Sequence, residues 1–155
     1  ALGNTKHLNL NETIAAATDS SIWNNTTPTA SVFTLGYDIK VNGNNDTFVA
    51  YLFATVAGVS KVGSFSHTND GGDTNVDCGF SSGARFVLYK QYDSSGAWYV
   101  LDSVRGIVAG NDPALLLNSN AAEDSSYDQI DPLSSGFTIP SAGVGTGDYI
   151  FYAIA

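Results

Sequence analysis

This 155-residue sequence contains no methionine, a single cysteine at Cys78, and glutamate only at Glu12 and Glu123. One cysteine cannot form a disulfide within the chain. A chain of this length can bury a sufficient core as one domain without a disulfide or a metal. We therefore expect one domain, with Cys78 as a small buried apolar residue rather than a reactive thiol.

Positive charge is also scarce, because 6 Lys and Arg residues stand against 15 Asp and Glu, for a net charge of −9. Such a surface repels nucleic acid and anionic membranes. No apolar run reaches the length that crosses a bilayer. We expect neither nucleic-acid binding nor membrane insertion.

Residues that favour helix surfaces are few, since charged residues make up only 14% of the chain. Gly, Ser, Thr and Asn are abundant instead, and these residues suit strands and turns. The composition predicts an all-β fold. Residues 11–21 and 120–128 are the only stretches that could form one or two helical turns, because Asn or Thr could cap them.

Two β-branched and aromatic runs, residues 47–56 and 84–92, are bounded by turn residues and predict strands. The second run continues into a hairpin over residues 84–103, turning at Asp93–Gly96. Residues 47–56 and 148–155 are apolar on both faces, which predicts central strands covered on both sides. Shorter strands are predicted at 6–10, 31–35, 59–66, 114–118 and 136–139.

The sequence also contains an internal repeat. "DTFVAYLFA" (46–54) matches "GDYIFYAIA" (147–155), "SVFTLG" (31–36) matches "SGFTIP" (135–140), and residues 7–17 match residues 114–123. The offset drifts from 107 to 104 to 101, as small loop deletions between two copies of one unit would produce. We expect one β-sandwich domain over residues 1–155, with pseudo-repeat halves at about 1–56 and 84–155 joined by 57–83.

The second half opens with the hairpin at 84–103, and the first half has no counterpart to it. We expect either that the first unit is trimmed or that its missing strands come from elsewhere. An uncovered apolar sheet edge is an aggregation hazard. A homo-oligomer, with a trimer favoured over a dimer, would cover this edge.

Three strings together, "WNNTTPT" (23–29), "VAYLFA" (49–54) and "DSVRG" (102–106), are distinctive. With the surrounding sequence they resemble a repeat-bearing module of tail- and fibre-associated proteins of tailed bacteriophages, especially marine ones. The resemblance covers nearly the whole chain. It implies an antiparallel, lectin-like or jelly-roll β-sandwich on the virion surface, outside the cell, that serves tail or fibre adhesion and has no catalytic residues.

A polar stretch, residues 67–79, is the first candidate site. Asp73, Asn75 and Asp77 alternate as in a calcium loop, but the twelfth position is Ala84 rather than Glu, which excludes an EF-hand. A looser calcium site could use Asp70, Asp73 and Asp77. The alternative is a solvated loop of turn-forming residues. No cofactor is required, and calcium is an optional one.

Trp23 lies in a polar stretch with Asn24 and Asn25, an arrangement that lectins use to hold a sugar ring. These three residues are the candidate glycan site. Alternatively, Trp23 plugs the edge of the sandwich with its indole N–H bonded to loop carbonyls. We expect Trp98 to lie in the core and Arg105 to pair with Asp102.

Catalytic motifs are lacking, because nearly all acidic residues fall in turns and no nucleophile elbow or phosphate loop occurs. We therefore expect a non-enzymatic module that binds a cell-surface glycan or protein. The alternative is a purely structural virion protein, such as a fibre repeat or a capsid decoration, whose function is self-assembly or contact with other virion proteins.

Overall fold

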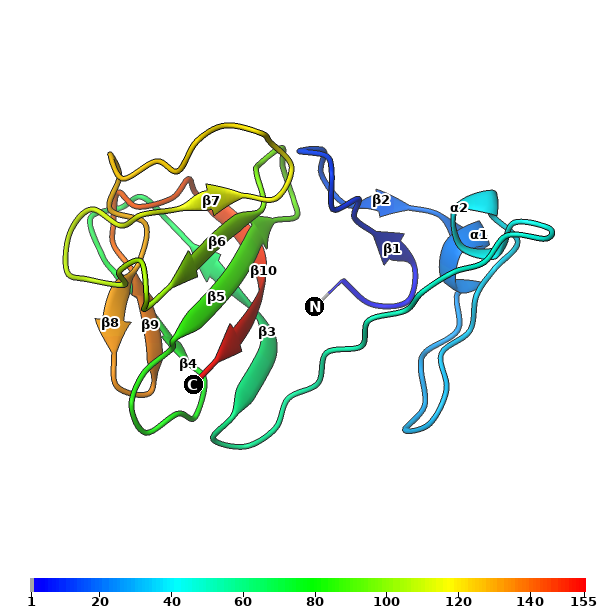
Figure 1. Ribbon diagram of the computed structural model, residues 1–155, viewed down its shortest axis with the longest axis horizontal. Coiled ribbons are helices and arrows are strands. Elements are labelled where there is room, and N and C mark those ends of the chain that lie inside the picture. The colour runs from blue at the N-terminus through cyan, green and yellow to red at the C-terminus, as the bar shows by residue number, and fades with distance from the viewer. Residues whose placement is uncertain (1) are drawn as a thin grey trace.

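The computed structural model describes residues 2–155 and shows an almost entirely β chain in which every strand pairing is antiparallel. Figure 1 shows an N-terminal unit (residues 2–46) beside a body (residues 56–155), with an extended segment (residues 47–55) running between them. The all-β prediction is confirmed, as is the limit of two short helices. The lectin-like or jelly-roll sandwich, the single domain and the pseudo-repeat stay predictions.

The body contains a five-stranded sheet in the order β3-β10-β5-β6-β7. Strand β10 is central, as predicted, because it pairs along its length with β3 on one side and β5 on the other. The predicted hairpin over residues 84–103 is also confirmed, since β5 pairs with β6. The strands are β3 (Ser60–His67), β5 (Phe86–Gln91), β6 (Tyr99–Asp102), β7 (Leu115–Leu116) and β10 (Gly147–Ile154).

A second, three-stranded sheet in the order β4-β9-β8 shares one hydrophobic core with the first. Phe137 from β9 meets Phe151 from β10 edge to face, with ring centroids 5.4 Å apart. Cys78 lies buried in this core, as predicted. The sequence does not predict β4 or β8, because polar and proline residues interrupt the strand pattern there. The strands are β4 (Thr74–Asp77), β8 (Asp131–Leu133) and β9 (Gly136–Ile139).

Asp102, the last residue of β6, stabilises the turn that follows this strand. Arg105 Nη2 lies 2.6 Å from Asp102 Oδ2, so the predicted ion pair is present. The other carboxylate oxygen of Asp102 accepts from the backbone N–H groups of Val104 and Arg105, both at 2.9 Å. Asp102 therefore fixes both the turn and the arginine.

The N-terminal unit holds a two-stranded sheet and two single-turn helices. Each helix begins at an aspartate whose carboxylate accepts a backbone N–H at 2.8 Å, from Ser21 to Asp19 and from Lys40 to Asp38. Such N-caps satisfy donors that a helix end leaves free. The elements are β1 (Lys6–His7), β2 (Ala17–Thr18), α1 (Ser20–Trp23) and α2 (Ile39–Asn42).

The helix predictions are only partly right. Within 11–21, only the last two residues enter α1, because Ala17 and Thr18 pair with β1 instead. Residues 120–128 form no helix, since Asp124 forms a β-bridge with Ala114. In both places backbone pairing across the chain outcompetes a short local helix.

Hydrogen bonds tie the N-terminal unit to one face of the five-stranded sheet. Trp98 is buried, as expected, and its indole N–H donates to the Asn9 carbonyl at 2.9 Å. Lys90 is fully buried, and its ammonium donates to the carbonyls of Thr13 at 3.1 Å and Gly96 at 2.5 Å. The burial lowers the Lys90 pKa by desolvation. The other sheet face packs against β4 and β9.

The prediction of a central strand at residues 47–56 is wrong for this chain. Residues 47–55 join no strand and are exposed throughout. A strand needs a neighbour to satisfy its backbone, and no strand among residues 2–155 pairs with residues 47–55. The strand predicted at 31–35 is absent too, although Thr29 N–H bonds the Val32 carbonyl at 2.9 Å across a tight turn.

Candidate functional site

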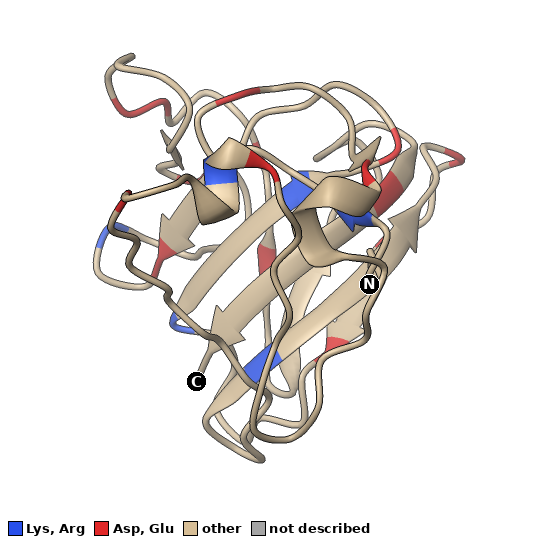
Figure 2. Cartoon of the chain, turned by 90° about the vertical axis from the view of Figure 1, so that its right-hand side faces the viewer, with Lys and Arg blue, Asp and Glu red and all other residues tan. Residues whose placement is uncertain are grey.

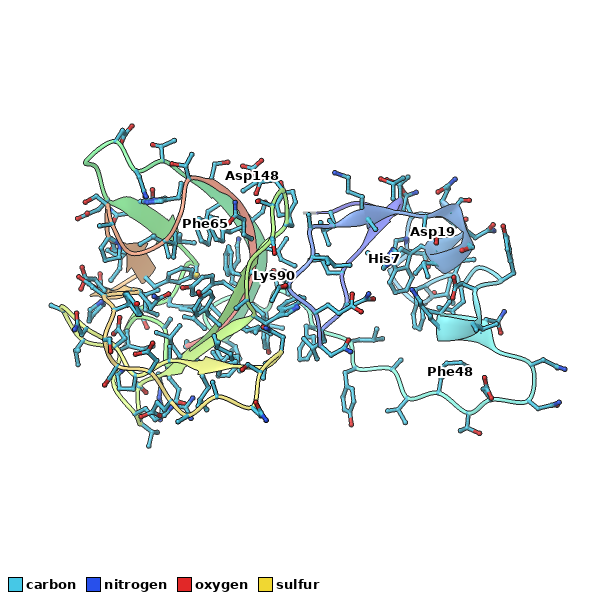
Figure 3. All side chains as sticks on the ribbon, turned by 90° about the horizontal axis from the view of Figure 1, so that it is seen from above. His7, Asp19, Phe48, Phe65, Lys90 and Asp148 are labelled. Atoms are coloured by element: carbon cyan, nitrogen blue, oxygen red, sulfur yellow. The ribbon has the colours of Figure 1, made fainter. Side chains whose placement is uncertain are left out.

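The extended segment is the most unusual surface of the molecule. Its run Phe48–Phe53 is wholly apolar, yet Tyr51 is 81% exposed and Leu52 is 76% exposed. No backbone group of residues 47–53 makes a hydrogen bond within the described part of the chain. Figure 3 shows Phe48 on this segment, away from Phe65, which lies among the side chains of the body. The run has strand chemistry without a partner strand.

The far end of the extended segment is anchored to the body. The Phe53 ring lies 4.7 Å from the Tyr152 ring, measured between centroids. Ser60 Oγ donates to the Ala54 carbonyl at 2.9 Å, and Val56 forms a β-bridge with Ser60. These contacts fix one end of the segment to the body. The unpaired residues 48–53 therefore lie next to an anchored part of the chain and do not belong to a loose terminus.

A groove of about 450 Å³ opens between the extended segment and the N-terminal unit. No charged residue occurs in the extended segment, which Figure 2 shows in tan along its course. An exposed, continuous apolar surface of this kind is uncommon in a monomeric protein and typically marks a binding surface. The apolar residues that line the groove opposite the segment are Trp23, Pro28, Phe33, Leu35 and Val41.

The predicted glycan residues are only partly brought together. Trp23 lies half-buried at the groove, and its indole N–H donates to the Lys6 carbonyl at 3.1 Å. Asn24 and Asn25 are exposed outside the groove, with φ angles of 51° and 48° where the chain leaves α1. The hydrogen-bonded indole N–H agrees with the alternative in which Trp23 has a structural role. The Trp23 ring nevertheless borders the groove.

The three predicted calcium ligands each serve a separate turn. Asp70 accepts from Gly72 N–H at 3.3 Å, and Asp77 accepts from Gly79 N–H at 2.8 Å. Asp73 accepts from Ser141 N–H at 3.0 Å. A hydrogen bond from the Thr68 side chain lowers the pKa of Asp70 most.

No group of three His, Cys, Asp or Glu side chains gathers closely enough to hold a metal ion anywhere in residues 2–155. The structure therefore does not bring Asp70, Asp73 and Asp77 into one ligand set. Calcium binding stays a prediction from the sequence.

A second apolar pocket of about 430 Å³, which the sequence does not predict, lies where the N-terminal unit meets the outer face of the five-stranded sheet. One sequence feature indicates such a contact. Residues 148–155 are apolar on both faces, so the face that points away from the core must also be covered by another part of the protein. The pocket is lined by Leu2, Leu10, Phe53, Val62, Leu88, Trp98, Ile150 and Tyr152, among others.

No helix within residues 2–155 is long and apolar enough to span a bilayer. Comparison with protein families places the chain over its full length, residues 1–155, in the DUF7483 family, described as a domain of unknown function. The chain belongs to that family. No curated protein and no solved structure matches it.

Proposed function

We propose that this DUF7483 domain is a non-catalytic module of a virion surface, in a phage tail or fibre, and that it works by binding protein. The observation that carries the proposal is the exposed, unpaired apolar segment Phe48–Phe53 beside an apolar groove. An unpaired strand offers a row of backbone donors and acceptors to another polypeptide. The purely structural role is thereby favoured over receptor adhesion.

The virion setting is supported by the resemblance of "WNNTTPT", "VAYLFA" and "DSVRG" to modules of phage tail proteins. The net charge of −9 is compatible with it, because a net charge away from zero keeps an exposed protein surface soluble. Detection of the protein in purified particles by mass spectrometry, with antibody labelling at the tail, tests this setting. Its absence from the particles would contradict it.

Self-association is the simplest way for the isolated chain to cover Phe48–Phe53. We expect a homo-oligomer, with a trimer favoured, at micromolar concentration by light scattering coupled to gel filtration. Leu52→Asp, which places a charge in the middle of the exposed run, should shift the chain toward monomer.

Val104→Asp is the matched control, because Val104 is 89% exposed on the body, far along the chain from the extended segment. It should leave the oligomeric state unchanged. A parent chain that stays monomeric at every concentration, and binds no other virion protein in pull-downs from disrupted particles, would contradict the protein-binding function.

Glycan binding is the second candidate function, because the half-buried Trp23 ring borders the groove. Aromatic rings stack on the apolar face of sugars. A glycan array with the parent chain tests it, and Trp23→Phe, which keeps a ring but removes the indole N–H, should retain part of any signal. An array without a signal leaves the protein-binding function in place and removes this one.

A further inference from the structure

Two backbone pairings occupy equivalent positions in the two predicted repeat halves. In the N-terminal unit, His7 pairs with Ala17. In the body, Ala114 forms a bridge with Asp124, and both members of that bridge lie 107 residues later in the chain. Leu10 and Leu117, which match in the two sequence segments, are also 107 residues apart, so sequence and backbone pairing agree on this offset.

A second equivalent pairing follows at the next offset. Thr29 N–H bonds the Val32 carbonyl in the N-terminal unit, and Leu133 pairs with Gly136 in the β8–β9 hairpin of the body. Both members of the body pair lie 104 residues later. The turn before "FTL" in one half is thus built as the turn before "FTI" in the other.

The alignment places residues 48–53 at the positions of residues 149–154, which lie in β10. In the body, those positions pair with β5, from Tyr149 opposite Gln91 to Ile154 opposite Phe86. The β5–β6 hairpin thereby covers one edge of β10. Within residues 2–155, nothing covers the same edge of residues 48–53.

The two sets of positions also differ in exposure. Tyr149 is 3% exposed and Ala153 is fully buried, whereas their counterparts Phe48 and Leu52 are 46% and 76% exposed. The hairpin contributes Val87, Tyr89 and Leu101 to the core of the body, all fully buried. The groove beside residues 48–52 is the corresponding apolar space in the N-terminal half.

We infer that Phe48–Phe53 is the acceptor for a β-hairpin of the kind formed by Phe86–Asp102, supplied by polypeptide other than residues 1–155. The inference rests on the proposed protein-binding function and names the partner. The first strand of the hairpin pairs antiparallel with Phe48–Phe53, as β5 pairs with β10, and its inward apolar side chains fill the groove. A lone strand from a second copy would satisfy the backbone but bring only one strand's side chains to the groove.

A grafted hairpin tests this directly. A duplicate of residues 84–107 is fused immediately before residue 1, which is the place that the 107-residue offset gives it. We expect the graft to give a monomer. Its backbone amides at residues 48–53 should exchange with solvent at least about 100-fold more slowly than those of the parent chain diluted until light scattering shows a monomer. Amide hydrogen exchange read by NMR or mass spectrometry, with light scattering, provides both measurements.

The matched control is the same graft with Val87→Asp and Leu101→Asp in the duplicate alone. This hairpin has equal length but cannot place apolar side chains in the groove, so residues 48–53 should exchange as in the parent. Adding Leu52→Asp to the intact graft should likewise remove the protection, whereas Val104→Asp in the body should keep it.

The outcomes separate the two proposals. If the parent chain is an oligomer whose residues 48–53 are protected, and the graft forms the same oligomer, the partner is a second copy. The hairpin is then refuted while protein binding stands. If residues 48–53 exchange freely in graft and parent alike, and the parent is monomeric and without partners, both proposals fail.

Discussion

At the scale of single residues, the body contains buried charged groups that face no opposite charge. The Asp112 carboxylate is fully buried and accepts from the backbone N–H groups of Val108, Gln129 and Ile130 at 2.9–3.1 Å. Lys90, equally buried, donates to carbonyls instead. Each charge is therefore satisfied by backbone dipoles, and each fixes loops that are distant in sequence.

Replacing Asp112 with alanine should destabilise the protein by about 2–4 kcal/mol, because it leaves three backbone donors without partners. Urea denaturation followed by tryptophan fluorescence measures the free energy of unfolding. Asp93→Ala, in the exposed hairpin turn, is the control and should change it by less than about 0.5 kcal/mol. An equal effect of both substitutions would contradict the role of Asp112.

The same residue predicts a pH dependence. Burial raises the pKa of Asp112 more than its hydrogen bonds to backbone N–H groups lower it. The folded protein therefore holds this proton at pH values where the unfolded chain releases it, so the stability that Asp112 contributes falls as the pH rises from about 4 through the raised pKa. Asp112→Ala should lack this decline in unfolding experiments between pH 3.5 and about 6.

Local residue predictions succeeded where the chemistry is local. The Asp102–Arg105 pair spans three residues and a turn, and the sequence predicted it. The role of Asp112 could not be predicted, since its partners Gln129 and Ile130 lie 17 and 18 residues away. The groove beside Trp23 was missed for the same reason, because its walls come from separate segments.

At the scale of elements, sequence patterns predicted strands that find partners within the chain. The runs at β5 and β10 are β-branched, aromatic and bounded by turns, and they pair as expected. Residues 47–56 have the same pattern but form no strand, since the pattern reports strand chemistry and not the presence of a neighbour. Strand β4, with sequence TNVD, lacks the pattern and forms because β9 lies beside it.

Close packing between β3 and β10 depends on Gly63. A Cβ at this position would lie 2.7 Å from two ring carbons of Phe151, which sits directly opposite and is nearly buried. Gly63→Ala should therefore cost about 1–3 kcal/mol, because the ring must shift within a packed core. Thermal and urea unfolding measure the loss.

Gly72→Ala is the matched control, since a Cβ there meets only the Asp70 carboxylate at an ordinary 3.6 Å. Its effect should stay within about 0.5 kcal/mol. A Gly63→Ala protein as stable as the parent would show that the Phe151 ring has room to move.

At the scale of the whole molecule, the core belongs to one part of the chain. The buried cluster shared by the two sheets is built from residues between Val76 and Ala153, with Phe65 and Ala155 packed against it. The N-terminal unit instead contributes acceptors at Asn9 and Thr13 and part of the cover over the outer sheet face. The body therefore has its own hydrophobic core, whereas the N-terminal unit depends more on its contacts with the body.

A fragment spanning residues 56–155 should therefore fold and unfold cooperatively. We expect it to lose about 2–4 kcal/mol, since Trp98 and Lys90 each lose a hydrogen bond and apolar sheet surface meets water. Circular dichroism in the near ultraviolet and urea denaturation measure fold and stability. An unfolded fragment would show that residues 2–55 and the body form one inseparable domain, as the sequence suggested.

The register of β3 against β10 also sets how the chain carries mechanical load. Ser60, where the chain enters β3, sits opposite Ile154, and Ala155 N–H bonds the Val59 carbonyl at 2.9 Å. The point where the extended segment joins the body and the C-terminal end therefore lie at the same end of this ladder. Tension between the N-terminal unit and residue 155 would break the backbone hydrogen bonds between β3 and β10 one residue pair at a time, which is the unzipping geometry. It would not shear all pairs at once, so along this axis the body yields at low force.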